Sequence, residues 1–150
     1  DVRHAAMERY VTDPYDGAQP VAIVEALARL KRGQLLSTAN SAWMIDTMMA
    51  NTTGHSRLRA GAPRDWDIGD KTGTGQDWDG ASVGINDIAL MTAPDGRTYA
   101  VAVMIQRTKQ GLESRRRFMQ SVSRAVVDHW RESDEANPTA QAAAAAPRKG

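Results

Sequence analysis

The chain has 150 residues, the size of one ordinary domain, and 41% of them are hydrophobic although only 5% are aromatic. Its 19 basic and 18 acidic residues give a formal charge of +1, which excludes the broad positive field that would attract nucleic acid or an anionic membrane. Cysteine is absent, so disulfides, thiolate catalysis and cysteine-ligated zinc are excluded as well.

The first segment, residues 1–19, predicts a surface loop. It carries charged side chains and then the sequence Pro-Tyr-Asp-Gly at 14–17, a composition typical of turns. The chain begins with neither a methionine nor a signal peptide, and nowhere does it contain the roughly 20 consecutive apolar residues of a membrane span. We expect residues 1–19 to follow an N-terminal portion that lies outside these 150 residues.

Two helices are predicted next. The first begins at Pro20, a favourable first helical residue, and ends near Gly33, with apolar side chains on one face at Ile23, Leu27 and Leu30. A cap at Ser37 or Thr38 begins the second helix, which ends at the Asn-Thr-Thr-Gly sequence of residues 51–54. One stripe of the second helix is interpreted as core packing, and it consists of Trp43, Met44, Thr47 and Met48.

Three further segments predict an antiparallel meander. The first runs from Trp66 into residues 70–75 (Asp-Lys-Thr-Gly-Thr-Gly), and the other two, 85–91 and 99–105, flank a Pro-Asp-Gly turn. Residues 76–84, rich in glycine and aspartate, are expected to form a loop at the mouth of a cleft.

The last ordered element is predicted to be a helix that covers the sheet. It begins at Leu112, with one apolar face formed by Phe118, Val122, Ala125, Val126 and Trp130, and with Arg115, Arg116 and Arg117 exposed. Residues 131–150 are rich in alanine and proline and contain little apolar bulk, so they are expected to be a disordered tail.

Lys71, Thr72 and Gly73 together suit a substrate carboxylate. The ammonium supplies charge, the hydroxyl supplies a directional donor, and glycine lets the backbone come close. Thr74 adds a second hydroxyl and a backbone N–H at an exposed strand edge, which can serve as one donor of an oxyanion hole. The Lys-Thr-Gly triplet is a weak signal on its own, because chance produces such a triplet in on the order of several percent of chains this long.

Two arginines upstream are candidates for the same anion site. Arg57 and Arg59 flank Leu58 and would face one way in an extended segment, so either guanidinium can reinforce the site with a bidentate contact. The alternative, two solvated surface side chains, is the one that spacing alone favours.

A longer pattern resembles the C-terminal part of the class A serine β-lactamases. It consists of residues 51–54 (Asn-Thr-Thr-Gly), 57–63 (Arg-Leu-Arg-Ala-Gly-Ala-Pro), Trp66, 69–75 (Gly-Asp-Lys-Thr-Gly-Thr-Gly), 86–89 (Asn-Asp-Ile-Ala) and the final helix. Lys-Thr-Gly belongs to the β-lactamase and penicillin-binding-protein signature. The likeness covers residues 20–130, which are expected to be the C-terminal part of a β-lactamase-like domain.

The resemblance implies an α+β fold, in which the terminal helix packs on an antiparallel sheet and part of a helical lobe lies beside it. It also implies the roles of three residues. Lys71 would hold the electrostatic environment of the nucleophile and the substrate carboxylate, and Thr72 and Thr74 would donate hydrogen bonds to that carboxylate. The N–H of Thr74 would complete the oxyanion hole.

The same resemblance implies a wider binding site. Arg57 would support carboxylate binding, Thr53 would line the cleft, and Gly73 and Gly75 would expose the backbone. The substrate would be a β-lactam, the location periplasmic or secreted, and no cofactor is implied. No metal site is predicted either, because the three histidines are far apart and the aspartates at 77, 79 and 87 lack the spacing of a calcium loop.

Two parts of the family's catalytic apparatus have no match in these 150 residues. No serine has a lysine three residues later, so the Ser-x-x-Lys motif of the nucleophile is missing, and neither Ser-Asp-Asn nor Ser-Asp-Gly occurs. The nearest candidate for the deacylating carboxylate, Glu8, has Thr12 where an asparagine is expected. We therefore expect the nucleophile and base in a missing N-terminal portion or a complementary chain, and no β-lactam hydrolysis by this segment alone.

Two alternatives stay open at this point. The segment can be a fragment of a penicillin-binding D,D-peptidase, which shares Lys-Thr-Gly, or a non-catalytic half that acts by associating with a complementary chain. Three strands without further partners leave an unpaired edge and an uncovered face, so self-association or pairing with the missing half is predicted.

Overall fold

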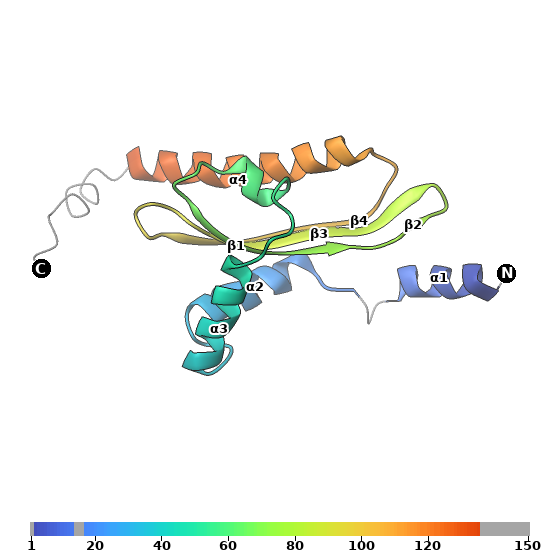
Figure 1. The fold of residues 1–150 in the computed structure, drawn as a ribbon, viewed down its shortest axis with the longest axis horizontal. Coiled ribbons are helices and arrows are strands. Elements are labelled where there is room, and N and C mark those ends of the chain that lie inside the picture. The colour runs from blue at the N-terminus through green and yellow to red at the C-terminus, as the bar shows by residue number, and fades with distance from the viewer. Residues whose placement is uncertain (1, 14–16, 136–150) are drawn as a thin grey trace, which may run out of the picture.

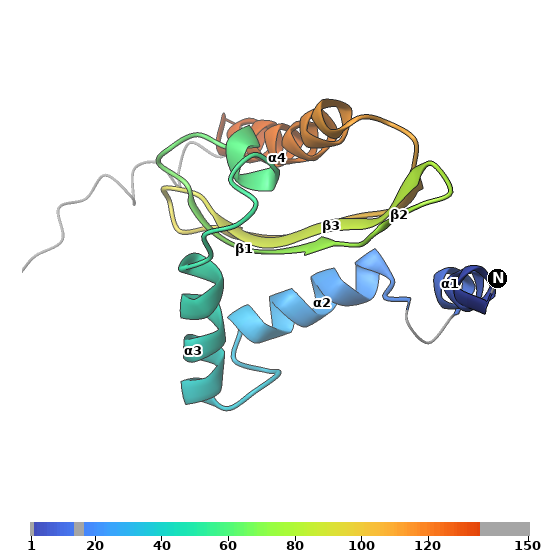
Figure 2. The ribbon, with the colours of Figure 1, turned by 45° about the vertical axis from the view of Figure 1, so that its right-hand side comes forward.

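The computed structural model describes residues 2–13 and 17–135, and its sheet and helices form three layers (Figure 1). An antiparallel sheet lies in the middle. Helix α4 (Leu112–Glu135) covers one face of it, and helices α2 (Pro20–Lys31) and α3 (Thr38–Met49) lie on the other (Figure 2). We call these the α4 face and the α2/α3 face. The α+β class expected from the sequence is confirmed.

The sheet is built around one long strand. Strand β3 (Ala81–Thr92) pairs with β1 (Asp67–Thr74) and the short β2 (Asp77–Trp78) along one edge, and with β4 (Thr98–Thr108) along the other. The predicted meander of β1, β3 and β4 is confirmed. Its last hairpin turns at Pro-Asp-Gly, where Gly96 has a φ of +91° that favours glycine.

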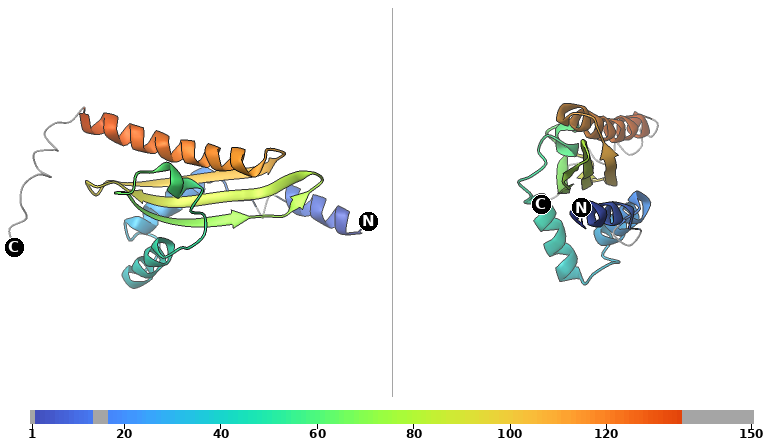
Figure 3. Two further views of the ribbon diagram at one scale, coloured as in Figure 1. Left: turned by 45° about the horizontal axis from the view of Figure 1, so that its top comes forward. Right: turned by 90° about the vertical axis from the view of Figure 1, so that its right-hand side faces the viewer.

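The main core lies between the sheet and α4, and the end-on view shows α4 lying over that face of the sheet (Figure 3). A short 3₁₀ helix, η1 (Leu58–Gly61), packs directly on α4 because two small residues meet there. A Cβ at Gly61 would come within 2.3 Å of the Gln120 carbonyl oxygen, and the buried Ser123 hydroxyl donates to the Leu58 carbonyl at 2.7 Å. The most buried apolar side chains of this face are Leu58, Ala89, Met91 and Met119.

The α2/α3 face has a smaller core, formed by Leu27, Leu30, Met48 and Leu90. Helix α2 packs on β4 and α3 packs on β1. A groove of about 550 Å³ remains between the helices and the sheet. Its lining is mainly apolar and includes Leu35, Leu36, Met44, Ile88 and the side chain of Lys71.

The two predicted apolar stripes are only partly correct. Of the α3 stripe only Met48 is buried, while Trp43 is 65% exposed and Met44 and Thr47 are exposed too, so the core interpretation is wrong for these three. On α4 the buried residues are Met119, Ser123 and Val127, and both Phe118 and Ala125 are exposed. The predicted Val122, Val126 and Trp130 are partly buried and pack against the main core. The buried face of α4 is therefore centred one position further along the helix than the predicted stripe.

The loop predicted for the first residues of the chain is wrong, because a helix lies there. Residues Val2–Thr12 form α1 where the sequence predicts a loop. This segment contains no glycine or proline and places His4 and Glu8 3.4 Å apart on one side of the helix, but none of its residues is buried. The apolar period that signals a packed helix is therefore missing from it.

Two other boundaries differ from the prediction. Residues 76–84 are not a plain loop, because β2 and the start of β3 form a hairpin whose turn residues, Asp79 and Gly80, both have positive φ. This is the geometry of a type I′ turn, for which Asp-Gly is a strong signal. Helix α4 continues to Glu135, so residues 131–135 are helical, and the rest of the predicted tail, 136–150, lies outside the described residues.

In the part of the chain that the structure describes, no helix is both long and apolar enough to cross a membrane. The predicted self-association stays a prediction.

Candidate functional site

Strand β1 presents the Lys-Thr-Gly segment with successive side chains on opposite faces. Thr72 and Thr74 alternate with Lys71, which lies on the α2/α3 face and lines the groove there. The Lys71 Nζ donates to the carbonyl oxygen of Thr72 at 2.7 Å. The ammonium and the two hydroxyls therefore reach the edge of β1 from opposite sides of the sheet.

Arg57, just before η1, donates hydrogen bonds to three other residues of the site on the α4 face. One guanidinium nitrogen, Nη1, donates to the carbonyl oxygens of Gly73 at 3.0 Å and Asn86 at 2.7 Å, and Nη2 donates to the Thr74 hydroxyl at 2.6 Å. Because the Thr74 oxygen accepts from Arg57, its own proton is available to donate to a ligand.

Thr53 meets Thr72 across the same edge, with their hydroxyl oxygens 2.9 Å apart. The turn that carries Thr53 is held by Asn51, whose Oδ1 accepts from the Thr53 N–H at 3.1 Å and from its hydroxyl at 2.9 Å. Gly54 follows with a φ of +76°, and a Cβ there would come within 2.4 Å of the Thr72 methyl group. The Asn-Thr-Thr-Gly sequence thus brings a second hydroxyl beside the Lys-Thr-Gly strand.

The backbone at Thr74 faces outward. The N–H of Gly75 donates inward to the Gly84 carbonyl at 2.9 Å, and peptide groups alternate in direction along a strand. The N–H of Thr74 therefore points to the outer edge of β1, where no strand among the described residues pairs with it. An oxyanion hole needs a fixed donor of this kind.

The space available for a side chain differs between Gly73 and Gly75. A Cβ on Gly75 would lie 2.1 Å from the Val83 carbonyl oxygen, so no larger residue fits without a backbone shift. A Cβ on Gly73 would lie 3.5 Å from the Asn86 side chain, an ordinary contact. The protein itself therefore requires glycine at position 75 but not at position 73.

Arg59 does not join the anion site. Its guanidinium binds the carboxylate of Asp70, which is completely buried on the α4 face. The expectation that Arg57 and Arg59 face one way is wrong, because the chain enters the 3₁₀ helix η1 at Leu58 and is not extended there. One arginine holds the site, and the other forms a buried ion pair behind it.

Asp87 is a second buried carboxyl under η1. Its Oδ2 accepts the Leu58 N–H at 3.1 Å, while its Oδ1 has no hydrogen-bond partner in the described structure. The pKa of Asp87 is raised from 3.8 to about 7, mainly by burial; the Asp70 charge acts in the same direction, and the Leu58 hydrogen bond and the two arginines act against it.

Sequence reasoning missed the roles of Asp70, Asn86 and Asp87. A signal for Asp87 was present, because its neighbours on the same face of β3 are apolar, whereas Asp70 has one apolar neighbour and one threonine on its face of β1. A charged residue at such a position needs a buried partner. The Asn86 carbonyl gives no sequence signal, because any residue supplies a backbone oxygen.

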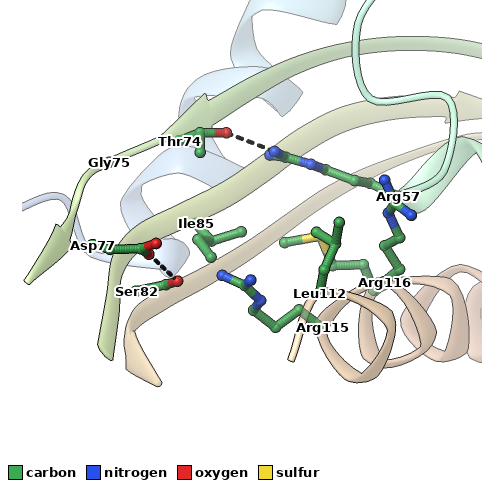
Figure 4. Close-up of a pocket in the computed structure, with 10 residues that line it drawn as sticks. Arg57, Thr74, Gly75, Asp77, Ser82, Ile85, Leu112, Arg115 and Arg116 are labelled. Atoms are coloured by element: carbon green, nitrogen blue, oxygen red, sulfur yellow. Dashed lines mark hydrogen bonds between the residues drawn. The ribbon is translucent and has the colours of Figure 1, made fainter. Parts of the chain in front are cut away.

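Arg57 and Thr74 also line a pocket of about 250 Å³ between the β1–β3 edge and the N-terminal end of α4 (Figure 4). Among the described residues, no group of three histidine, aspartate or glutamate side chains is arranged to hold a metal ion.

The geometry of this site and of the fold agrees with known proteins. The chain belongs to the beta-lactamase enzyme family, whose family model matches residues 3–130. It is 43% identical over 102 residues to a β-lactamase from Mycobacterium tuberculosis, covering 68% of this chain and 32% of that protein. It is 36% identical over 119 residues to the Escherichia coli β-lactamase CTX-M-25, covering 79% of this chain and 39% of the relative.

Solved structures show the same class. An ancestral class A β-lactamase (GNCA) superimposes with a TM-score of 0.69 at 36% identity, covering 79% of this chain and 44% of that one. A β-lactamase from Chitinophaga pinensis gives a TM-score of 0.74 at 28% identity, with 86% and 47% coverage. The resemblance to class A serine β-lactamases is confirmed, and the chain spans less than half the length of these relatives.

Proposed function

We propose that this chain supplies the carboxylate-binding and oxyanion wall of a serine β-lactamase that opens the β-lactam amide through an acyl-enzyme. In that reaction a serine hydroxyl adds to the lactam carbonyl, the C–N bond breaks, and the ring nitrogen takes a proton. Water then hydrolyses the ester. The serine belongs to a segment outside these 150 residues, and the site operates in the periplasm or outside the cell.

One observation carries the proposal. The Arg57 guanidinium donates to the Thr74 hydroxyl at 2.6 Å, on the strand whose Lys71 side chain lies on the opposite face. Among the described residues no strand pairs with the outer edge of that strand. A substrate carboxylate at that edge would receive hydrogen bonds from Thr72 and Thr74 and charge from Lys71 and Arg57. The outward N–H of Thr74 would donate to the oxyanion that develops on the lactam carbonyl.

The test is a chimera in which the N-terminal part of the M. tuberculosis relative, up to the matched region, precedes this chain. We expect the chimera to hydrolyse nitrocefin and the 150-residue chain to show none. In the chimera, Lys71→Ala and Arg57→Ala should each lower kcat/KM by about 10²-fold or more. Each substitution removes a positive charge that would stabilise the bound carboxylate or the oxyanion. Lys31→Ala, an exposed lysine at the end of α2, is the matched control and should change little.

Three outcomes contradict parts of the proposal. Nitrocefin turnover by the 150-residue chain alone would place the nucleophile within it. A folded chimera that does not hydrolyse nitrocefin would contradict the role assigned to this wall. A chimera that becomes acylated by penicillin and stays acylated would favour the D,D-peptidase alternative.

A further inference from the structure

The pocket shown in Figure 4 begins at the carboxylate-binding residues and continues beyond them toward α4. Thr74 and Arg57 line its entrance side. Its other polar side chains come from the β2–β3 hairpin and from the first turns of α4, and they are Asp77, Ser82, Arg115 and Arg116. Three apolar side chains complete the lining, Ile85, Leu112 and Met119.

The charges of this pocket are unbalanced. Three guanidinium groups line it, against the single carboxylate of Asp77. That carboxylate already accepts the Ser82 hydroxyl at 2.5 Å. Arg116 is paired with Glu113 at 2.6 Å, one turn earlier on α4. An excess of positive charge therefore remains inside the pocket.

Of the three guanidinium groups in this pocket, that of Arg115 lacks a hydrogen-bond acceptor among the described residues. Arg57 donates to three acceptors, whereas no described residue accepts a hydrogen bond from the Arg115 side chain, and its Nε is fully buried. In Figure 4 the Arg115 side chain extends from α4 toward Ser82 and Ile85. The buried Nε adds an unpaired donor to the same guanidinium, whose outer nitrogens lie at the pocket, so an anion there can pair with a charge that no described residue neutralises.

We propose that this pocket is a second anion subsite, in which Arg115 binds an acidic group on the part of a β-lactam that extends past the ring carboxylate. The apolar floor of Ile85 and Met119 strengthens the attraction, because both residues are buried and exclude water. The substrate class is then a dianionic β-lactam, one anion on Thr72, Thr74 and Arg57 and the other on Arg115. The identity of the ligand as a β-lactam rests on the proposed function, whereas the affinity of the pocket for an anion does not.

The first experiment uses the 150-residue chain and inorganic phosphate as the probe, at constant ionic strength. Phosphate is titrated while the backbone amides of Thr74, Gly75 and Ser82 and the Nε–H of Arg115 are followed by ¹⁵N nuclear magnetic resonance. Saturable shifts at these groups are expected. Arg115→Gln should weaken the apparent affinity about tenfold, the size of one charge-assisted hydrogen bond, and Arg115→Lys should lie between the two.

The matched control is Arg117→Gln, which removes the same charge from an exposed position two residues further along α4. It should leave the phosphate affinity within about twofold of the parent, because an exposed charge is screened. If Arg115→Gln and Arg117→Gln weaken binding equally, the effect is one of net charge and the subsite is refuted. Binding that Arg115→Gln leaves unchanged refutes it as well.

The second experiment uses the chimera described above with two cephalosporins that share one acyl side chain. Cefotaxime carries a neutral acetoxymethyl group next to the ring carboxylate, and ceftriaxone carries an acidic triazine there. Arg115→Gln should lower the ratio of kcat/KM for ceftriaxone over cefotaxime about tenfold, and Arg117→Gln should leave that ratio unchanged. An unchanged ratio with Arg115→Gln contradicts the assigned substrate class. An inactive chimera that still binds phosphate through Arg115 would contradict the β-lactamase role and leave the anion subsite standing.

Discussion

The two faces of the sheet differ in how completely they are packed. The α4 face holds Leu58, Met91 and Met119 at no more than 1% exposure, together with the buried carboxyls of Asp70 and Asp87. The α2/α3 face has four buried apolar residues and an apolar groove of about 550 Å³, and Trp43 on its outer helix is 65% exposed. Most of the burial that stabilises this chain is therefore on the α4 face.

The proposed site residues divide in the same way. Arg57 is fixed by three hydrogen bonds on the α4 face, next to η1 and its buried carboxyls. Lys71, on the α2/α3 face, donates only to the neighbouring Thr72 carbonyl in the described structure. The difference indicates that the arginine and threonine side of the site is preorganised within this chain, whereas the lysine side needs a further contact to fix it.

The largest effect is expected from the buried ion pair. Asp70→Asn leaves the Arg59 guanidinium without its counter-charge in a largely buried place, so the free energy of unfolding should fall by about 3–5 kcal/mol. Asp128→Asn, which breaks an exposed pair with Arg131 on α4, should cost under about 1 kcal/mol. Urea unfolding measures both, and equal losses would show that the α4 face does not hold its charges as described.

Apolar truncation compares the faces directly. Met91→Ala on the α4 face removes a completely buried side chain and should lower the free energy of unfolding by about 2–5 kcal/mol. Trp43→Ala removes a larger side chain that is mostly exposed, and it should change that free energy by under about 0.5 kcal/mol. A loss of more than about 2 kcal/mol for Trp43→Ala would mean that the α2/α3 face is packed in solution.

A smaller effect on the free energy of unfolding depends on pH. The pKa of Asp87 rises from 3.8 to about 7 on folding, so the folded state holds a proton that the unfolded chain has already lost. The contribution of Asp87 to the free energy of unfolding should therefore fall as pH rises from about 4 to about 7 and stay level above that. Asp87→Asn should flatten this slope, and Asp67→Asn, at an exposed position of β1, should not. Parallel pH profiles for the parent and Asp87→Asn would contradict the assignment.

The smallest effect concerns the cap of α3. The Ser37 hydroxyl accepts the Asn40 N–H at 3.3 Å, so Ser37→Ala should lower the free energy of unfolding by about 1 kcal/mol. Ser121→Ala, an exposed serine inside α4, is the control and should change little. If Ser37→Ala has no effect on thermal or urea unfolding, α3 contributes little to the cooperative fold.

Local sequence patterns predict the helix that begins at Pro20, the helix that follows the cap at Ser37 or Thr38, the meander and the Pro-Asp-Gly hairpin, because each depends on neighbouring residues. The separate fates of Arg57 and Arg59 were not predictable from spacing, since they depend on a 3₁₀ turn and on Asp70, a residue eleven positions away. The exposure of Trp43 was not predictable either, because an apolar stripe predicts burial only where another element covers it. The Asp-Gly pair at residues 79–80 is itself a hairpin signal, and the loop prediction for 76–84 does not include it.

The central claim is that the carboxylate-binding wall is already formed in this chain. Titration of the ¹⁵N-labelled 150-residue chain with benzylpenicillin tests it most directly. We expect saturable shifts centred on the amides of Thr72, Thr74 and Gly75, lost in Arg57→Ala, with the antibiotic recovered intact. Shifts confined to the apolar groove of the α2/α3 face, or shifts that Arg57→Ala leaves unchanged, would contradict it.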